Sequence, residues 1–454
     1  MFGKMDATMT LRAEAGVRSR FDWIFIGTAA GLVLLGSLAI FSAASPIPAY
    51  GQIIQRHLIA LLLGAGLFAF AMSLNYQVFQ DQAPAIYGLI LALLACVLLF
   101  GTAHKGHRAW IQFASLSFQP SELARTGMIL VLAAYLTRRA RRITELTTVL
   151  GAVGLMAPVL LLILKEPDFA TALSFLPILL GMLFCAGASI RHLSAIAGYG
   201  MVALGLPLLI TWCQIRGASA APGSWPELLL RSSRLGAPAA LAMLAAGLLS
   251  LGAWRLAGLL RLQVKAAAFI AVPLIFSAGL VSGIAVNARL KGYQRNRFVA
   301  YVAPQEDIQG AAYHVRQSQI AIGSGGILGK GLFAGTQSQL GFLPERHTDF
   351  IYAVVGEEMG FWGTMGILGI YLLLIWRVVL AARAARDYYG YLVCCGLAAM
   401  LAFALALNMG MCLGLIPVAG VPLPLISYGG SSLAITLWSL GIVANIYARR
   451  YALL

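Results

Sequence analysis

The chain has 454 residues, of which 60% are hydrophobic and only 11% are charged, and its mean hydropathy is +0.85. This composition excludes a soluble globule, because too few charges remain to cover its surface and apolar runs of about 20 residues recur along the sequence. The net charge of +16 does not indicate nucleic-acid binding, since the basic residues lie mostly in short loops between apolar runs.

The apolar runs predict an all-α polytopic membrane protein. They are continuous rather than alternating, which disfavours a β-barrel. We expect a cytoplasmic N-terminal tail at 1–20 and a single integral membrane domain at 21–454. Twelve predicted spans follow one another at 21–44, 57–74, 84–102, 121–137, 147–165, 169–188, 193–213, 237–253, 266–287, 349–376, 389–409 and 430–447.

Basic loops decide which side of the membrane each end of a span faces. Arginines follow the fourth run at 138–142 and the last run at 449–450, and basic residues also follow the sixth, eighth and tenth runs. Cytoplasmic loops carry the excess of Lys and Arg. Both termini are therefore predicted to be cytoplasmic, and the segments 103–120, 288–348 and 414–429 face the opposite side.

Polar residues occur inside or beside several spans, where a membrane makes them costly. In QPSELAR, Glu122 and Arg125 are one helical turn apart and can neutralise each other, while Pro120 and Ser121 suit a helix start. In KEPDFATA, Asp168 is placed to stabilise the start of a helix.

Two further polar stretches lie late in the chain. Glu357 and Glu358 are about 100° apart around a helix, so at least one should point into the bundle. GVPLPLISYGGSS, which includes Ser427, is a non-helical stretch at the entrance to the last span, and such a stretch is tolerated only where protein or water shields it. The six cysteines lack metal-ligand spacing, and we predict no metal site from them.

The polar segment 293–358 is the strongest functional signal. An adjacent Glu306-Asp307 pair offers carboxylate chemistry. The segment also carries cations suited to an anionic head group, namely Arg295, Arg297, Arg316, Lys330 and Arg346.

The motifs GHRAW, FQPSELA, EPDFATA, YQRNR, QSQIAIGSGGILGKG, FLPERHTDFI and GVPLPLISYGGSS occur in this order between about residues 101 and 450. In this combination the chain resembles the SEDS family (shape, elongation, division and sporulation), the bacterial peptidoglycan glycosyltransferases that polymerise lipid II. GTQSQL, FLPERHTDF and PVAGVPLPLISYGG are more similar to the RodA-like elongation branch than to the division branch. The resemblance therefore implies a lipid II polymerase that serves cell elongation and cell shape.

The resemblance also implies roles for individual residues. Asp307 matches the catalytic aspartate of the family and is the candidate general base. Candidates for the substrate cavity are Glu122, Arg125, Lys330, Arg346, His347, Asp349 and Ser427, and candidates for diphosphate contacts are Arg295, Arg297 and Arg316. No metal ligands are predicted, although a divalent cation such as Mg²⁺ or Mn²⁺ could assist at the diphosphate.

Two departures from the family pattern stand out. Arg125 occupies a position where the family usually has Lys, which favours charge pairing over proton relay because a guanidinium does not readily titrate. The family also usually has ten spans, so the region 214–290 is predicted to contain an inserted helical hairpin. Arg255, Arg261 and Lys265 predict a cytoplasmic turn near its middle.

The implied partners are a class B penicillin-binding protein, which is a transpeptidase, and the elongation machinery, in the bacterial inner membrane. Two other functions stay open at this point. A flippase or transporter for the same lipid would also use broken helices and intramembrane polar residues. A non-enzymatic scaffold of the cell-wall elongation complex would need no base at Asp307.

Overall fold

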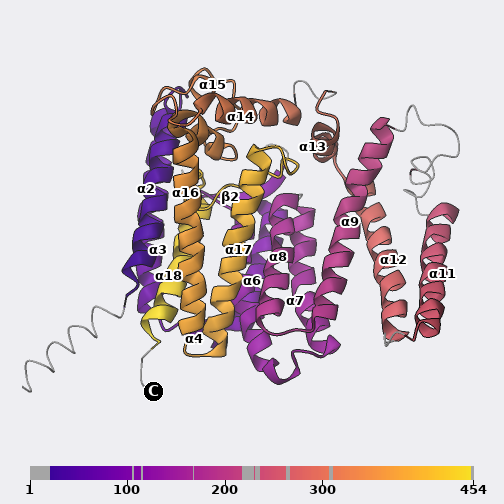
Figure 1. Cartoon of the computed structure of the whole chain (residues 1–454). Helices are drawn as coiled ribbons and strands as arrows, with labels where there is room; N and C mark the ends of the chain where they lie inside the picture. Colours follow the sequence, from indigo (N-terminus) through magenta and orange to yellow (C-terminus); the bar gives the residue numbers. More distant parts are fainter. Residues whose placement is uncertain are drawn as a thin grey trace, which may run out of the picture. The chain divides into compact units, whose positions relative to one another are not determined.

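The computed structural model describes residues 21–450 except 105–106, 114–115, 167, 217–229, 231–235, 262–265 and 306–309 (Figure 1). The N-terminal half contains α2 (Trp23–Ala44), α3 (Tyr50–Ser73), α4 (Gln77–Asp81), α5 (Ala83–Phe100), α6 (Pro120–Arg138), a 3₁₀ turn (Ala140–Arg142), α7 (Leu146–Lys165), α8 (Phe169–Cys185) and α9 (Ile190–Arg216). The C-terminal half contains α11 (Ala237–Leu259), α12 (Ala266–Arg289), α13 (Gly292–Val302), α14 (Ala311–Gly325), α15 (Thr336–Gln339), α16 (Ile351–Ala384), α17 (Tyr388–Cys412) and α18 (Gly430–Ala448).

Each of the twelve predicted spans corresponds to a helix, so the protein is an all-α polytopic membrane protein. Ten of the described helices are long and apolar enough to cross a membrane. The other two are α6, which has Glu122 in its first turn, and α8, which is apolar but has only 17 residues. The predicted start of the second span was seven residues late, because α3 begins at Tyr50 rather than at residue 57.

The chain divides into two compact units. Unit 1 contains residues up to Gly187, Gln317–Leu413 and Ala419–Leu454, and unit 2 contains Ala188–Arg316 with Gly414–Val418. The predicted long loop at 288–348 is partly helical, since α13, α14 and α15 lie within it.

In unit 1, α3 and α18 pack closely along their length. A β-carbon at Gly441 would lie 2.6 Å from the carbonyl oxygen of Phe68, so only glycine permits this approach. The side chain of Asn445 on α18 donates hydrogen bonds to the carbonyl oxygens of Ala71 and Met72 at 3.1 and 2.6 Å. Those carbonyls belong to the last turn of α3 and have no partner within their own helix. The last helix of the chain thus caps the second span.

In unit 2, α12 packs against α9 through two glycines one turn apart. A β-carbon at Gly279 would lie 2.8 Å from Val202 Cβ, and one at Gly283 would lie 2.9 Å from Leu206 Cβ. This spacing is the small-residue pattern that lets membrane helices approach closely. The hydroxyl of Tyr199 donates to Ser282 at 2.9 Å beside the same contact. The fit fixes α12 on α9.

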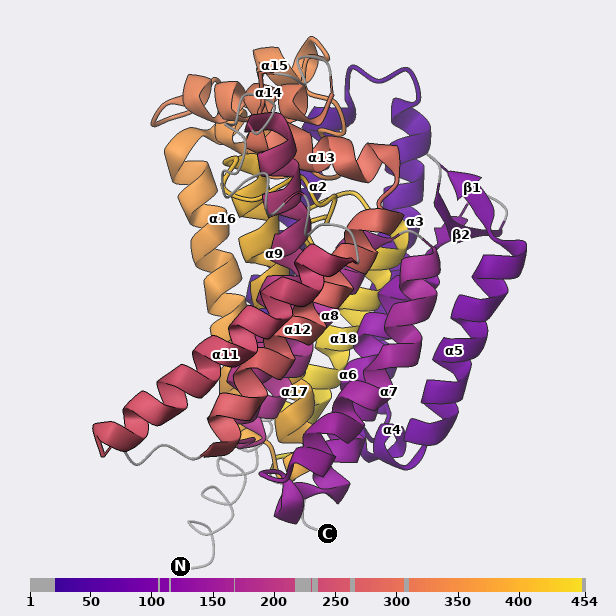
Figure 2. The ribbon, with the colours of Figure 1, turned by 90° about the vertical axis from the view of Figure 1, so that its right-hand side faces the viewer.

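A small antiparallel sheet follows α5, where sequence reasoning expected a loop. Its strands are β1 (Thr102–His104), β2 (His107–Phe113) and β3 (Leu116–Phe118), in the order β1-β2-β3. It lies at the same end of unit 1 as α15 (Figure 2). We call this the loop end, made of residues 44–50, 101–104, 107–113, 116–122, 165–166, 168–169, 326–350, 413 and 419–430.

Candidate active site

The ion pair predicted between Glu122 and Arg125 is present at the start of α6. The Arg125 guanidinium donates to the Glu122 carboxylate, and each residue is only 5% exposed. Pro120 occupies the first turn as predicted, but the prediction that Ser121 caps the helix is wrong. Its hydroxyl instead donates to Asp168 Oδ2 at 3.1 Å, because that carboxylate offers an acceptor from the neighbouring α7–α8 connection.

Asp168 joins α6 to α8. It caps α8 as predicted, since its Oδ1 accepts from the backbone N–H of Thr171 at 3.1 Å. Its Oδ2 also accepts from Gln119 Nε2 at 2.8 Å. Gln119 and Ser121, which lie 49 and 47 positions before Asp168, therefore meet at one carboxylate.

Glu166, two residues earlier, is fully buried, and neither of its carboxyl oxygens has a hydrogen-bond partner within the described part of the chain. Burial, together with the nearby charge of Asp168, raises the pKa of Glu166 to about 8. The Glu166 side chain is thus protonated at neutral pH, which avoids a buried, unpaired charge.

Both glutamates of the GEE motif, Gly356-Glu357-Glu358, are buried in unit 1. Glu357 accepts four hydrogen bonds, from Lys330 Nζ at 2.9 Å, Thr336 Oγ1 at 2.9 Å, and the backbone N–H groups of Gln337 and Ser338 at 2.8 and 3.1 Å. Lys330, predicted to contact substrate, is held by this carboxylate.

Glu358 faces a different element. Its Oε1 accepts from Ser42 Oγ on α2 at 2.6 Å. Glu358 Oε1 also accepts from Ser338 Oγ at 3.4 Å, so the two carboxylates share Ser338, and Glu358 in addition reaches α2.

The glycine-rich segment after α14 inserts into a break in α16. Gly360 has a φ of 63°, which breaks the helix, and a β-carbon there would lie 2.3 Å from the Gly329 nitrogen. The backbone N–H groups of Lys330 and Gly331 donate to the carbonyls of Glu357 and Glu358 at 3.0 and 2.9 Å. Backbone groups freed by the break are thus satisfied by the loop.

Arg346, His347, Asp349 and Ser427 also lie at the loop end of unit 1. Arg346 is 8% exposed and donates from Nε to the Ala43 carbonyl at 2.8 Å, and burial lowers its pKa. The carbonyl oxygens of His347 and Asp349 accept from Tyr428 N–H and Asn408 Nδ2. Ser427 Oγ accepts from the Leu423 backbone N–H at 2.8 Å and so stabilises its own turn.

Among the described residues, no contact inside a single unit links the remaining predicted site residues to the polar residues of the loop end. Asp307 and its neighbour Glu306 lie outside the described residues. Arg295 on α13 and Arg316 on α14 belong to unit 2 and are exposed, whereas Arg297 is half-buried.

Sequence reasoning missed a polar group around Tyr428. His57 is buried on α3, with Ser37 Oγ 2.9 Å from its Nε2, and its ring lies 6.4 Å from that of Tyr428. Burial raises the pKa of Tyr428, and the positive charge of Arg56 opposes this rise. The sequence did carry a signal, since Arg56 and His57 are adjacent in a largely apolar stretch, but the predicted span began at residue 57 and left Arg56 outside it.

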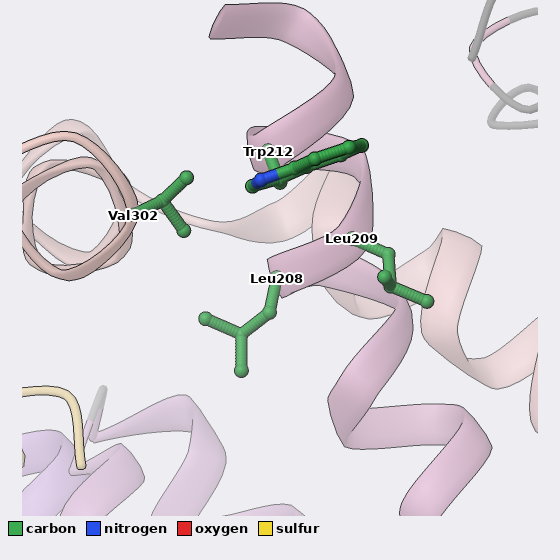
Figure 3. Close-up of a pocket in the computed structure, with 4 residues that line it drawn as sticks. All are labelled: Leu208, Leu209, Trp212 and Val302. Carbon is green, nitrogen blue, oxygen red and sulfur yellow. The ribbon is translucent and has the colours of Figure 1, made fainter. Parts of the chain in front are cut away.

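A pocket of about 310 Å³ lies between α9 and α13 in unit 2 (Figure 3). Leu208, Leu209, Trp212 and Val302 line it. These side chains offer no acid, base or cation, so the pocket suits hydrocarbon rather than group-transfer chemistry. Within the described ranges, no group of three or more His, Cys, Asp or Glu side chains could hold a metal ion.

The sequence profile of the FtsW/RodA/SpoVE family, described as cell cycle protein, matches residues 19–218 and 228–452. The chain belongs to the FtsW/RodA/SpoVE family. The match covers α11 and α12 as well as the ion pair on α6, the Asp168 connection and the GEE motif. These features are therefore placed within the fold of this family.

Individual FtsW/RodA/SpoVE proteins match along nearly the whole chain. It is 32% identical over 442 residues to the peptidoglycan glycosyltransferase RodA of Treponema pallidum, covering 95% of this chain and 98% of that protein. It is 32% identical over 422 residues to the peptidoglycan glycosyltransferase MrdB of Escherichia coli, covering 92% and 93%.

Solved structures also match along nearly the whole chain. The chain matches a protein from work on structural coordination of polymerization and crosslinking by a peptidoglycan synthase complex, with 30% identity and a TM-score of 0.62, covering 95% of this chain and 99% of that one. Rod shape determining protein RodA of Thermus thermophilus matches with 27% identity and a TM-score of 0.59, covering 95% and 98%.

Proposed function

We propose that this protein is a peptidoglycan glycosyltransferase that polymerises lipid II during cell elongation. The observation that carries the proposal is the 32% identity, over nearly the full length of both chains, to peptidoglycan glycosyltransferases RodA and MrdB. The fold, the buried polar contacts at the loop end and the motif order support the same activity.

In the proposed reaction, the 4-hydroxyl of one lipid-linked saccharide attacks the anomeric carbon of another. The new C–O bond forms as the bond from that carbon to the diphosphate breaks, and the bonding electrons leave with the diphosphate. Asp307 takes the proton of the attacking hydroxyl, and nearby cations stabilise the departing charge. The ion pair of Glu122 with Arg125 lies at the start of α6, at the same end of unit 1 as the other loop-end residues.

Contacts within the protein limit the roles that we propose for the other candidate site residues. Lys330 is held by Glu357, and Arg346 by the Ala43 carbonyl. We therefore assign Lys330 and Arg346 to shaping the loop end, and we keep Arg295, Arg297 and Arg316 as candidates for anion contact.

The proposed partner is a class B penicillin-binding protein within the elongation machinery. A solved relative comes from work on a peptidoglycan synthase complex that coordinates polymerisation with crosslinking, which supports a transpeptidase partner. We further propose that the protein resides in the bacterial inner membrane with both termini in the cytoplasm, on the strength of its basic loops.

Incubation of the purified full chain with lipid II, with and without the transpeptidase, tests the activity. The parent should make glycan strands, and Asp307→Asn should lose activity by roughly 10²–10⁴-fold while still folding, because the amide keeps the size of the side chain but removes the base. Glu306→Gln is the matched control, one residue away in the same segment, and should lose much less.

Equal polymerisation by the Asp307→Asn and Glu306→Gln variants would exclude Asp307 as the base. A parent that moves lipid II between leaflets and makes no strands, with or without the partner, would favour a flippase.

A further inference from the structure

Two of the six cysteines lie on neighbouring helices of unit 1. Cys185 is the last residue of α8, and Cys395 lies about two turns into α17. The two helices lie side by side (Figure 1). Both thiols are free, and both side chains are partly exposed, so a small reagent can reach them.

Gly181 lets α17 approach α8 closely. A β-carbon at Gly181 would lie 2.8 Å from Ala399 Cβ, so only a residue without a side chain fits there. Beside this contact, a β-carbon at Gly396 would lie 2.8 Å from the sulfur of Met182. Small residues at such positions bring the backbones of two membrane helices together. The end of α8 therefore packs tightly on the first half of α17.

Two tyrosines fix the last turn of α8 to the first turns of α17. The hydroxyl of Tyr391 donates to the carbonyl oxygen of Cys185 at 3.3 Å, and that of Tyr388 donates to the carbonyl oxygen of Ala186 at 2.9 Å. Carbonyls at the C-terminal end of a helix have no N–H partner within that helix. The tyrosines supply those donors and hold the backbone of Cys185 against α17.

These contacts set the register of the two helices. Along α8 they advance from Gly181 to Cys185. Along α17 they go back from Ala399 to Tyr391, so the two helices are antiparallel. Cys395 lies four residues from each of these two positions, and residues four apart share a helix face. The side chain of Cys395 therefore faces α8, where Cys185 is one turn beyond Gly181 on the contacting face.

The adjacent Cys394 differs in both direction and access. It lies about 100° around α17 from Cys395, so it does not share the face that meets α8 in this register. Its side chain is fully buried, whereas that of Cys395 is partly exposed. Two neighbouring cysteines of one helix thus have different surroundings.

We propose that Cys185 and Cys395 form a reversible disulfide site that cross-links α8 to α17. A disulfide requires Cα atoms about 4.4–6.8 Å apart, a spacing that only closely packed helices reach. Disulfides that form inside cells are mostly transient and sense the redox state. The site is therefore reduced under resting conditions and closes when a low-molecular-weight disulfide accumulates.

The cross-link forms by two thiol–disulfide exchanges with a small disulfide, RSSR. The thiolate of one cysteine attacks a sulfur of RSSR, which forms a mixed disulfide and releases RS⁻. The second thiolate attacks the protein sulfur of the mixed disulfide, which forms the bond between Cys185 and Cys395 and releases the second RS⁻. The two cysteines lose two electrons, RSSR gains them, and the two thiol protons pass to the released RS⁻ groups.

The disulfide site lies apart from the candidate active site. α8 begins beside Asp168, at the loop end, and Cys185 lies about 24 Å along the helix axis from Phe169. α17 reaches the loop end through Asn408, whose side chain donates to the carbonyl oxygen of Asp349 at 3.0 Å. A cross-link at the opposite ends of these two helices would fix their relative position without occupying the substrate cavity.

Reaction of the purified full chain with glutathione disulfide tests the proposal. The reduced protein in nanodiscs is incubated with glutathione disulfide, the remaining thiols are alkylated, and the peptides are identified by mass spectrometry. We expect one peptide pair joined through Cys185 and Cys395, and its loss when reduced glutathione is added. Cys185→Ser and Cys395→Ser should each abolish this pair.

Cys394→Ser is the matched control, one residue away on the same helix. It should form the cross-link at the rate of the parent, because its thiol faces elsewhere. The oxidised parent should also melt about 5 °C higher than the reduced parent, since a cross-link restricts the unfolded chain. Cys185→Ser and Cys395→Ser should melt close to the reduced parent whether or not glutathione disulfide is present, which also shows that they fold.

Three outcomes would overturn the proposal. In the first, both thiols of the parent stay open to alkylation or carry only glutathione. In the second, the cross-link joins Cys185 to Cys394. In the third, the cross-link joins two copies of the chain, which appears as a dimer on a non-reducing gel. No readout involves lipid II, so these results are independent of the proposed function.

Discussion

The ammonium of Lys330 lies 2.9 Å from a carboxylate oxygen of Glu357, 27 residues later in the chain and fully buried. The contact closes the glycine-rich segment over the break in α16, together with two backbone hydrogen bonds from Lys330 and Gly331. A lysine that sequence reasoning placed in the substrate cavity therefore also holds the loop end together.

The first prediction concerns this contact. Glu357→Ala should destabilise the protein strongly, by about 3–5 kcal/mol, because it leaves Lys330 and three other donors without their acceptor. Lys330→Met should cost less, since Glu357 keeps Thr336 and two backbone N–H groups as donors. Thermal unfolding in detergent measures both. Equal melting temperatures for the two variants would show that the carboxylate does not organise the segment.

The second prediction concerns the Glu122–Arg125 pair. Arg125→Lys should retain substantial polymerase activity, because it preserves the charge next to the carboxylate. Arg125→Ala should lose far more and should destabilise the protein by about 3–5 kcal/mol, since it leaves a buried carboxylate unpaired. Activity and unfolding are measured on the same preparations. Parent-like behaviour of Arg125→Ala would mean that the pair contributes to neither.

The third prediction concerns the pH dependence set by Glu166. Its folded-state pKa of about 8 lies above the ordinary 4.5, so between these values the native state binds more protons than the unfolded state. Stability should therefore fall as pH rises from about 4.5 to about 8, with a slope from this group of up to about 1.4 kcal/mol per pH unit. Glu166→Gln should remove this component and melt at a higher temperature than the parent near pH 8.

Asp168→Asn serves as the comparison, because the Asp168 carboxylate, unlike that of Glu166, accepts hydrogen bonds from Gln119 and Ser121. It should lower stability rather than raise it, since the amide is a poorer acceptor for those donors and for the backbone of α8. A Glu166→Gln variant with the same pH profile as the parent would place the titrating group elsewhere.

The fourth prediction concerns unit 2. Gly283→Ala should destabilise the packing of α12 on α9 by about 1–3 kcal/mol, because the added methyl group meets Leu206 and the Ala203 carbonyl. Gly258→Ala on α11 is the matched control, since a β-carbon there has open space around it. The control should be neutral or slightly stabilising, by up to about 1 kcal/mol. Limited proteolysis of the intact membrane protein, followed as the rate of cleavage within α12, measures the difference between the two variants.

The helices were predictable because membrane spans follow from apolar length alone, and every predicted run became a helix. The Glu122–Arg125 pair and the Asp168 cap were also predictable, since both depend on residues three apart on one helix. Contacts between distant segments were not. The acceptor for Ser121 lies on another connection, and the partner of Lys330 lies beyond the α15 segment.

The polar group around Tyr428 shows a second limit. Its members come from residues 37, 56–57, 347 and 428, and no local spacing links them. The sequence placed GVPLPLISYGG in a shielded position but could not say what shields it. Gly36 on α2 does so in part, because its missing side chain admits the backbone of Leu425 and Ile426.

The capping of α3 by Asn445 affects how the protein is made. A ribosome releases α3 into the membrane long before it has synthesised α18, because more than 350 residues separate Ala71 from Asn445. During that interval the final carbonyls of α3 lack the amide that later binds them. Insertion of the early spans and completion of their packing are thus separate events in time, and a chain that terminates before residue 445 would leave its second helix permanently unfinished.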